Sequence, residues 1–171
     1  MNQIKTFIEE NWHSSGYAVL LFHGVTAIDE IEMGARNSNK KHLKASEFME
    51  VLSLLESMQS QFMLMSELED SIQEDKTLEK VVCLTFDDGF RNNLNTAIPL
   101  MNKFNAKATI YVTTDFIEKN LMSWIDRVEF AVDSTHVKFL DLHGYSFPMG
   151  SLPQKIQCLK DIRKIYKQKP V

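Results

Sequence analysis

Two apolar runs in this chain stop abruptly at polar residues and indicate strands of a buried sheet. Residues 17–23 and 81–86 show no strict alternation, which is typical of strands covered on both faces. A third such run, 107–113, follows the second within 35 residues. The segment between them, 91–104, is expected to be a helix with Pro99 as a local irregularity. Strand, helix and strand in this order predict a right-handed βαβ unit and an α/β fold with a parallel sheet.

The remaining segments show either apolar residues at helical spacing or residues typical of turns. We expect helices over residues 4–12, 46–60, 123–133 and 152–168. Ser66-Glu67-Leu68-Glu69 fits a capping box that would open one more helix. A small hairpin is expected around His143-Gly144. The last helix is rich in Lys and Arg, and the simplest interpretation of these charges is a solvated face.

Composition narrows the class of protein. The 171 residues are 44% hydrophobic and 25% charged, which predicts one globular domain. We expect residues 1–115 to form the βαβ core and 116–171 a helical and hairpin insertion. The net charge of −4 argues against a nucleic-acid partner. Cys83 and Cys158 lack metal-type spacing and favour a reducing compartment.

The amino terminus and the hydropathy pattern bear on location. Residues 1–11 include Glu9 and Glu10 and lack a basic start followed by an apolar stretch, so no secretory signal is expected. The longest apolar runs are far shorter than the ~20 residues that a membrane-spanning helix needs. These patterns predict a soluble, cytoplasmic protein without a transmembrane segment.

The strongest chemical signal is the acidic pair Asp87-Asp88 followed by Gly89, at the end of the 81–86 run. Chemistry in α/β folds gathers at the carboxyl ends of strands. Neighbouring side chains on a strand point to opposite faces, so two Asp residues address one centre only where the pleat has ended. Gly89 can adopt the backbone angles of such an ending. Two adjacent carboxylates resist joint ionisation unless a cation lies between them or one of them holds a proton. A divalent metal site is therefore the first hypothesis, and a solvated Asp-Asp-Gly turn is the alternative.

Three segments together resemble the polysaccharide deacetylase family (carbohydrate esterase family four). They are Leu20-Leu21-Phe22-His23-Gly24-Val25, Leu84-Thr85-Phe86-Asp87-Asp88-Gly89-Phe90 and Ala108-Thr109-Ile110-Tyr111-Val112. The resemblance spans roughly residues 15–135 and includes an insertion-like stretch around Ser123-Trp124. It implies a distorted or partial (β/α) barrel with an α+β tail.

The resemblance also implies a reaction and a site. The expected activity is the metal-assisted removal of acetyl groups from an acetylated amino-sugar oligomer or polysaccharide. Asp87 would be the general base and Asp88 a ligand of a divalent metal, usually zinc. His23, Phe90 and Trp124 would contact the substrate.

One family motif is missing from the chain. Members normally supply two further metal ligands from a His-Ser/Thr-x-x-His segment, and nothing after Val112 has that pattern. Asp88 alone cannot hold a catalytic zinc, which ordinarily takes three protein ligands. We expect a truncated enzyme, a remnant, or a site completed by another chain, with weak metal binding and little turnover in each case. An unfinished barrel would expose a sheet edge and favour self-association.

Other interpretations stay open at this point. The first is a non-catalytic remnant that binds sugar or another partner. A receiver-like phosphoacceptor is disfavoured, because no suitable third strand supplies its further acidic and basic residues. His13-Ser14-Ser15-Gly16-Tyr17 begins like the missing motif, but a loop into the first strand is expected there. His143 resembles the family's catalytic acid in sequence context, but it precedes a hairpin glycine and is more simply structural.

Overall fold

The computed structural model describes residues 2–27 and 33–167, which divide into two units. Unit 1 contains residues 2–27 and 41–113, and unit 2 contains residues 33–40 and 114–167. Each unit has a hydrophobic core of its own. Across these described residues, no helix has the length and the apolar character needed to cross a membrane.

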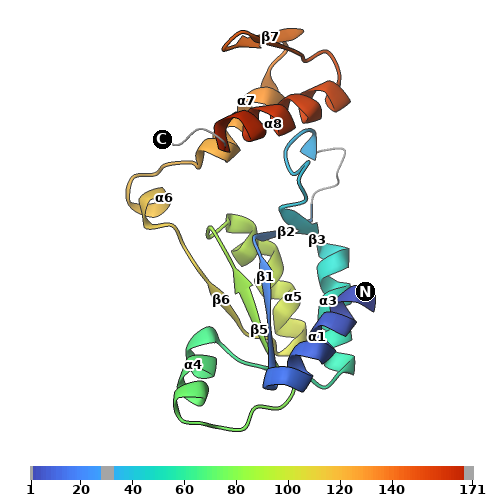
Figure 1. Cartoon of the computed structure of the whole chain (residues 1–171), viewed down its shortest axis with the longest axis vertical. Helices are drawn as coiled ribbons and strands as arrows, with labels where there is room; N and C mark the ends of the chain where they lie inside the picture. The colour runs from blue at the N-terminus through green and yellow to red at the C-terminus, as the bar shows by residue number, and fades with distance from the viewer. Residues whose placement is uncertain (1, 28–32, 168–171) are drawn as a thin grey trace. The chain divides into compact units, whose positions relative to one another are not determined.

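A parallel sheet forms the centre of unit 1 (Figure 1). Strand β5 (Val81–Phe86) pairs along its whole length with β1 (Tyr17–Phe22). On its other side, β5 pairs first with β4 (Gln61–Phe62) and then with β6 (Ala108–Ile110). All of these pairings are parallel, which confirms the expected α/β class. Closure into a barrel stays a prediction.

A second, shorter parallel pairing was not expected from the polar residues 26–44. Strand β2 (Gly24–Thr26) follows directly after β1, and it pairs with β3 (His42–Lys44). Gly24 lies opposite His42 in this register. The pairing brings a histidine to the end of the sheet at which β1 terminates.

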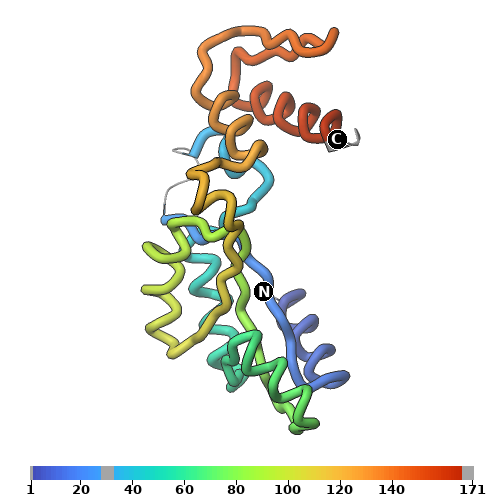
Figure 2. Tube along the Cα trace, turned by 90° about the vertical axis from the view of Figure 1, so that its left-hand side faces the viewer, coloured from blue at the N-terminus to red at the C-terminus, as the bar shows by residue number. Residues whose placement is uncertain are grey.

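Helices cover the sheet of unit 1 on both faces, which explains why the two main strands lack alternation. The core on one face is formed by α1 (Asn2–Ser15), α3 (Ala45–Ser57) and α5 (Ile98–Met101). On the opposite face, Leu68 of α4 (Met65–Gln73) packs against Val81 and Cys83. Figure 2 shows the strands of this sheet running side by side along the Cα trace.

Three local expectations in unit 1 need correction. Helix α4 begins before Ser66, and the carboxylate of Glu67, rather than Glu69, accepts a hydrogen bond from the amide of Leu64. Segment 91–104 is not a regular helix, because the π-helical η1 (Asn93–Ala97) precedes α5 and the 3₁₀-helical η2 (Asn102–Phe104) follows it. Residues 13–15 are the last turn of α1, not a loop.

Unit 2 is built from helices and a hairpin. Its elements are α6 (Thr114–Glu118), α7 (Trp124–Ser134), β7 (Phe139–Leu142), β8 (Tyr145–Pro148) and α8 (Leu152–Lys167). The hairpin forms as expected, because His143 and Gly144 both have positive φ, as a two-residue hairpin turn requires. Helix α6 was not expected, and the predicted end of the last helix at Gln168 lies outside the described residues.

Two basic residues of α8 hold it to α7. Lys155 Nζ donates hydrogen bonds to the carbonyl oxygens of Asp133 (2.7 Å) and Thr135 (2.8 Å) at the end of α7. Arg163 forms an ion pair with Glu129, whose side chain is buried, while that of Arg163 is 14% exposed. The basic residues of α8 are therefore not simply a solvated face, as the sequence suggested, because Lys155 and Arg163 hold the two helices together.

The segment before β3 also belongs to unit 2. Ala35 is fully buried in the unit 2 core, and its amide donates a 2.6 Å hydrogen bond to Asp133 Oδ1. Arg36 Nε lies 3.0 Å from Asp133 Oδ2. Gly34 has φ +57°, and a Cβ at this position would lie 2.2 Å from Asp133 Oδ1. Asp133 therefore fixes residues 34–36 against α7.

Candidate active site

The acidic pair lies at the carboxyl end of β5, the central strand of unit 1. The amide of Asp87 donates a 2.9 Å hydrogen bond to the carbonyl of Phe22, the last residue of β1. On the other side, the amide of Tyr111 donates a 2.7 Å hydrogen bond to the carbonyl of Phe86. Asp87 and Asp88 are both half-buried. The loop is thus held between the ends of two neighbouring strands, where α/β folds place their chemistry.

The chain reverses direction sharply after Asp87. Asp88 has φ +68° and Gly89 has φ +62°, so two successive residues adopt the left-handed conformation. A Cβ at position 89 would lie 2.8 Å from Val112 Cγ1, so glycine suits this position in both backbone angle and space. Asp88 adopts its strained angle without that freedom, a condition that often accompanies functional loops. Since the pleat has ended, the two carboxylates need not point to opposite faces.

The backbone of His23 lies beside that of the acidic pair, although the two are far apart in sequence. It follows Phe22, whose carbonyl accepts the hydrogen bond from the amide of Asp87. Phe22 and Phe86 lie opposite each other in the register of β1 and β5, so His23 and Asp87 leave the sheet side by side. The structure therefore brings His23, Asp87, Asp88 and Phe90 to one end of unit 1. Trp124 belongs to unit 2.

Phe90 contacts His42, a histidine that no sequence motif marks. The ring centroids of Phe90 and His42 are 4.7 Å apart in an edge-to-face arrangement. Lys41 Nζ lies 4.6 Å from the Phe90 ring centroid, within the range of a cation–π interaction. Phe90 is half-buried, so only part of it remains available to a substrate. Its predicted role in substrate binding stays a prediction.

His42 is held in place by Asn92 and by the absence of a side chain at Gly24. Asn92 Nδ2 and His42 Nδ1 lie 3.0 Å apart. A Cβ on Gly24 would lie 2.1 Å from His42 Nδ1 and 2.6 Å from Asn92 Oδ1. The only sequence signal for this cluster was Gly24 directly after His23, because a glycine inside a strand often marks a close approach.

A buried amide lies directly after the acidic loop. Asn93 is 2% exposed, and neither its Oδ1 nor its Nδ2 has a hydrogen-bond partner in the described residues. Its backbone amide donates a 2.9 Å hydrogen bond to the carbonyl of Phe90, which closes the turn into η1. A buried amide without partners is uncommon in folded proteins. In this position it is available to hold a polar group, such as a water molecule, behind the loop.

The described residues do not assemble a full metal site. Within residues 2–27 and 33–167, no group of three or more His, Cys, Asp or Glu side chains is arranged to hold an ion. A catalytic zinc ordinarily has three protein ligands, so Asp88 and its described neighbours do not fit the complete ligand set. The assignment of Asp88 as a ligand stays a prediction.

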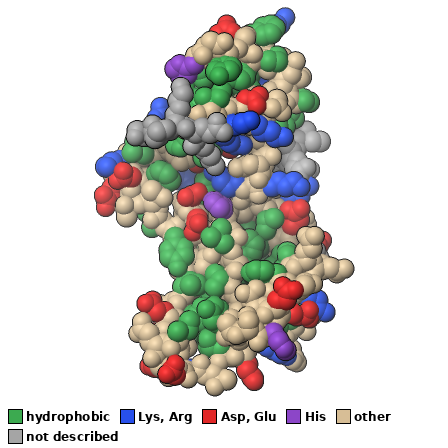
Figure 3. Space-filling model, in the orientation of Figure 1, with side chains coloured by type: hydrophobic (Ala, Val, Ile, Leu, Met, Phe, Trp, Pro, Cys, Tyr) green, Lys and Arg blue, Asp and Glu red, His purple; other side chains and the backbone are tan. Residues whose placement is uncertain are grey.

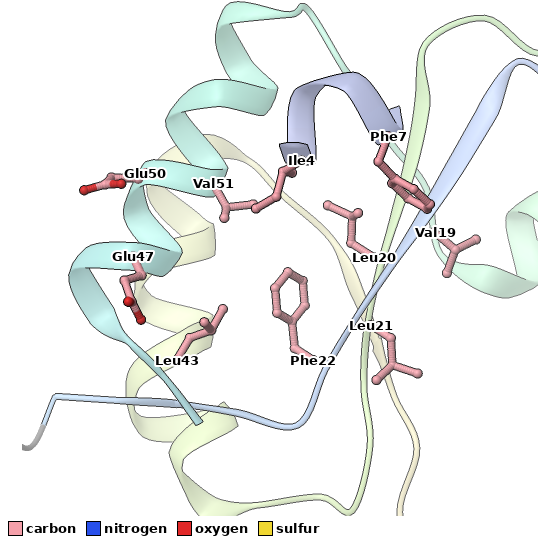
Figure 4. A pocket seen from close by; sticks show the side chains of 10 residues that line it. All are labelled: Ile4, Phe7, Val19, Leu20, Leu21, Phe22, Leu43, Glu47, Glu50 and Val51. Atoms are coloured by element: carbon pink, nitrogen blue, oxygen red, sulfur yellow. The ribbon is translucent and has the colours of Figure 1, made fainter. Parts of the chain in front are cut away.

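A separate groove of about 550 Å³ lies beside the outer edge of β1 (Figure 4). Its walls are residues of α1, β1, β3 and α3, namely Ile4, Phe7, Val19, Leu20, Leu21, Phe22, Leu43, Glu47, Glu50 and Val51. Leu21 is 59% exposed, and β1 ends the order of its sheet among the described strands. Figure 3 shows hydrophobic side chains at the surface over the sheet. An unpaired strand edge can pair with another chain, and the expected self-association stays a prediction.

Comparison with known proteins identifies the family. A family model described as polysaccharide deacetylase matches residues 74–168, so it includes Asp87, Asp88 and Trp124 and excludes His23. The Bacillus subtilis (strain 168) protein named putative polysaccharide deacetylase YxkH is 29% identical over 101 residues, which cover 55% of this chain and 34% of YxkH.

Two solved structures align with this chain. The Streptococcus pyogenes deacetylase PplD, in complex with acetate, matches with a TM-score of 0.51 and 22% identity over 68% of this chain and 52% of its own. A de-N-acetylase from Aggregatibacter actinomycetemcomitans gives a TM-score of 0.48 and 18% identity over 86% of this chain and 51% of its own. The chain thus spans about a third of YxkH and about half of each solved chain. Because the family model covers more than half of its residues, this chain belongs to the polysaccharide deacetylase family.

Proposed function

We propose that unit 1 carries the hydrolytic centre of a carbohydrate deacetylase that removes acetyl groups from an acetylated amino-sugar oligomer or polysaccharide. The observation that carries the proposal is the position of Asp87-Asp88. The pair follows the central strand of a parallel sheet and turns through two left-handed residues beside His23, in a chain of this family.

Asp87 is the proposed general base. Its carboxylate would take a proton from the attacking water as the oxygen bonds to the acetyl carbon. The carbon–nitrogen bond then breaks, the proton passes to the leaving amine, and acetate and the free amino sugar are released. Within residues 2–27 and 33–167, no hydrogen bond or ion pair occupies the Asp87 carboxylate, which leaves its lone pairs available for this role.

Polysaccharide deacetylases generally use a divalent metal, and we propose zinc with Asp88 as one ligand. The described residues do not supply the full ligand set. The same observation supports weak metal binding and little turnover by the chain alone. It also supports a second candidate function, a non-catalytic module that binds sugar. A cytoplasmic location is proposed from the sequence pattern alone.

The decisive assay is acetate release from the hexamer of N-acetylglucosamine, with and without added Zn²⁺. We expect slow release that increases with Zn²⁺ and falls at least ~100-fold in Asp87→Asn, because general-base catalysis contributes factors of this size. Asp75→Asn is the matched control, since Asp75 is also an aspartate of unit 1 but is exposed. Complete absence of acetate at every Zn²⁺ concentration would favour the sugar-binding module instead.

Metal binding is measured separately by calorimetric titration with ZnCl₂. We expect a dissociation constant weaker than micromolar, and a further loss of affinity in Asp88→Asn but not in Asp75→Asn. Sub-micromolar affinity combined with fast turnover would contradict the expectation that the chain lacks part of its ligand set.

A further inference from the structure

Three aromatic side chains meet on the surface of unit 2. Trp124 is the first residue of α7, Tyr166 lies in the last turn of α8, and His143 occupies the hairpin turn. The ring centroids of Trp124 and Tyr166 are 6.3 Å apart, and those of His143 and Tyr166 are 6.0 Å apart. Trp124 is 45% and Tyr166 37% exposed, and His143 is exposed as well. We call these three residues the aromatic platform.

The platform rests on a rigid support. The ion pair between Arg163 and Glu129 and the hydrogen bonds of Lys155 to the end of α7 hold the two helices together. The backbone at Trp124 is fixed by Ser123, whose Oγ accepts a hydrogen bond from the amide of Asp126. The helices that carry Trp124 and Tyr166 are therefore already held together before a ligand binds, which favours affinity.

The chemistry of the rings favours a saccharide. Trp, Tyr and His each combine a flat apolar face with a polar atom at the ring edge. A sugar ring has the complementary pattern, with C–H groups on its faces and hydroxyl groups around its rim. An aliphatic partner would offer no hydrogen bonds to the indole N–H, the phenol O–H and the imidazole nitrogens, whereas the hydroxyl groups of a sugar do.

We propose that the aromatic platform binds the acetylated amino-sugar chain through stacking, as a binding site formed entirely within unit 2. This inference rests on the proposed function for the class of ligand. All three residues fall inside the segment that matches the family model. The platform makes unit 2 a module that retains the polymer independently of the acidic loop.

The test is calorimetric titration of the full chain with the hexamer of N-acetylglucosamine. We expect Trp124→Ala and Tyr166→Ala each to weaken binding at least tenfold, while Trp124→Phe retains most of the affinity. Phe139→Ala is the matched control. Phe139 is 64% exposed on the same hairpin, but the strand register places it on the face opposite Leu140 and Phe147. This control is expected to bind within twofold of the unchanged chain.

The outcomes separate the platform from the reaction. Binding that survives in Asp87→Asn but is lost in Trp124→Ala supports the platform, whether or not acetate is released. Equal binding by the unchanged chain, Trp124→Ala and Tyr166→Ala overturns it, even if hydrolysis is fast. Absence of binding by the unchanged chain overturns it as well. A chain that is dimeric in solution and becomes monomeric in Trp124→Ala would also overturn the proposal, because the platform would then be a contact between two copies of the chain. Circular dichroism of each variant verifies that unit 2 remains folded.

Discussion

Replacing Gly24 with alanine is the sharpest test of the cluster beside the acidic loop. Gly24 is buried at the start of β2, and an added Cβ would lie 2.1 Å from His42 Nδ1 and 2.6 Å from Asn92 Oδ1. Both distances are far below van der Waals contact, so His42, Asn92 or the strand must move. His42 cannot move without leaving its contacts with Asn92 and Phe90.

The expected cost follows from three contributions. Overpacking at a well-filled site costs ~1–3 kcal/mol, and loss of the hydrogen bond between Asn92 and His42 costs ~1 kcal/mol. Restricting the unfolded chain by Gly→Ala recovers ~0.4–1 kcal/mol. We therefore expect Gly24→Ala to lower the free energy of unfolding of unit 1 by about 2 kcal/mol.

Urea unfolding followed by Trp12 fluorescence measures this effect in unit 1. The indole of Trp12 donates a 2.9 Å hydrogen bond to the carbonyl of Val81, and Trp124→Phe removes the only other tryptophan. The control repeats Gly24→Ala in a His42→Ala/Asn92→Ala background, where the added methyl group has space. There neither the clash nor the lost hydrogen bond contributes, so the cost should fall to ~0.5 kcal/mol or less. An equal cost in both backgrounds would show that the clash with His42 and Asn92 is not its cause.

Three further outcomes are expected. Gly89→Ala should destabilise unit 1 by ~1–2 kcal/mol in urea unfolding, because residue 89 adopts the left-handed conformation. Gly89→Asn should cost less, since Asn tolerates this conformation better than Ala. Equal costs for the two substitutions would exclude the backbone angle as the cause. Burial raises the pKa of the Cys83 thiol to about 11, above the ordinary value of 9.0 that the unfolded chain retains. Unit 1 should therefore lose stability in urea titrations as the pH rises from about 9 to about 11, and an equally steep loss in Cys83→Ala would contradict this. Arg163→Leu should destabilise unit 2 by ~3 kcal/mol, because this substitution leaves the buried Glu129 without its cation. The loss is measured by urea unfolding followed by Trp124 fluorescence. The double substitution Glu129→Leu/Arg163→Leu should recover most of the lost stability.

The parallel core was predictable because several independent features of the sequence indicate it. The run 81–86 is apolar throughout except for Thr85, and the acidic pair with Gly89 marks where it ends. The βαβ order around it admits essentially one handedness. The structure accordingly places Asp87 beside the end of β1, next to His23.

The contacts around Phe90 were not predictable, because they depend on tertiary structure alone. His42 lies in a polar stretch without periodicity, and only the pairing of β2 with β3 brings it to Asn92. The π-helical turn at Asn93 likewise leaves no mark in a pattern that resembles an ordinary helix. Lys155 and Arg163 could not be distinguished from the solvated basic residues of α8, since charge type alone does not reveal which of them have partners on α7.

The contact between Ala35 and Asp133 has a consequence for biosynthesis. The two residues are 98 positions apart, and at translation rates of ~5–20 residues per second the ribosome needs ~5–20 s to produce the second after the first. During that interval Ala35 has emerged without the helix that buries it, so unit 2 cannot assemble while the sheet strands are being made. A cut after residue 113 would divide unit 2 between two fragments, and expressing its helices alone would leave the carboxylate of Asp133 without its backbone partner. A fragment designed to fold as unit 2 alone must therefore include residues 33–40 together with α7 and α8.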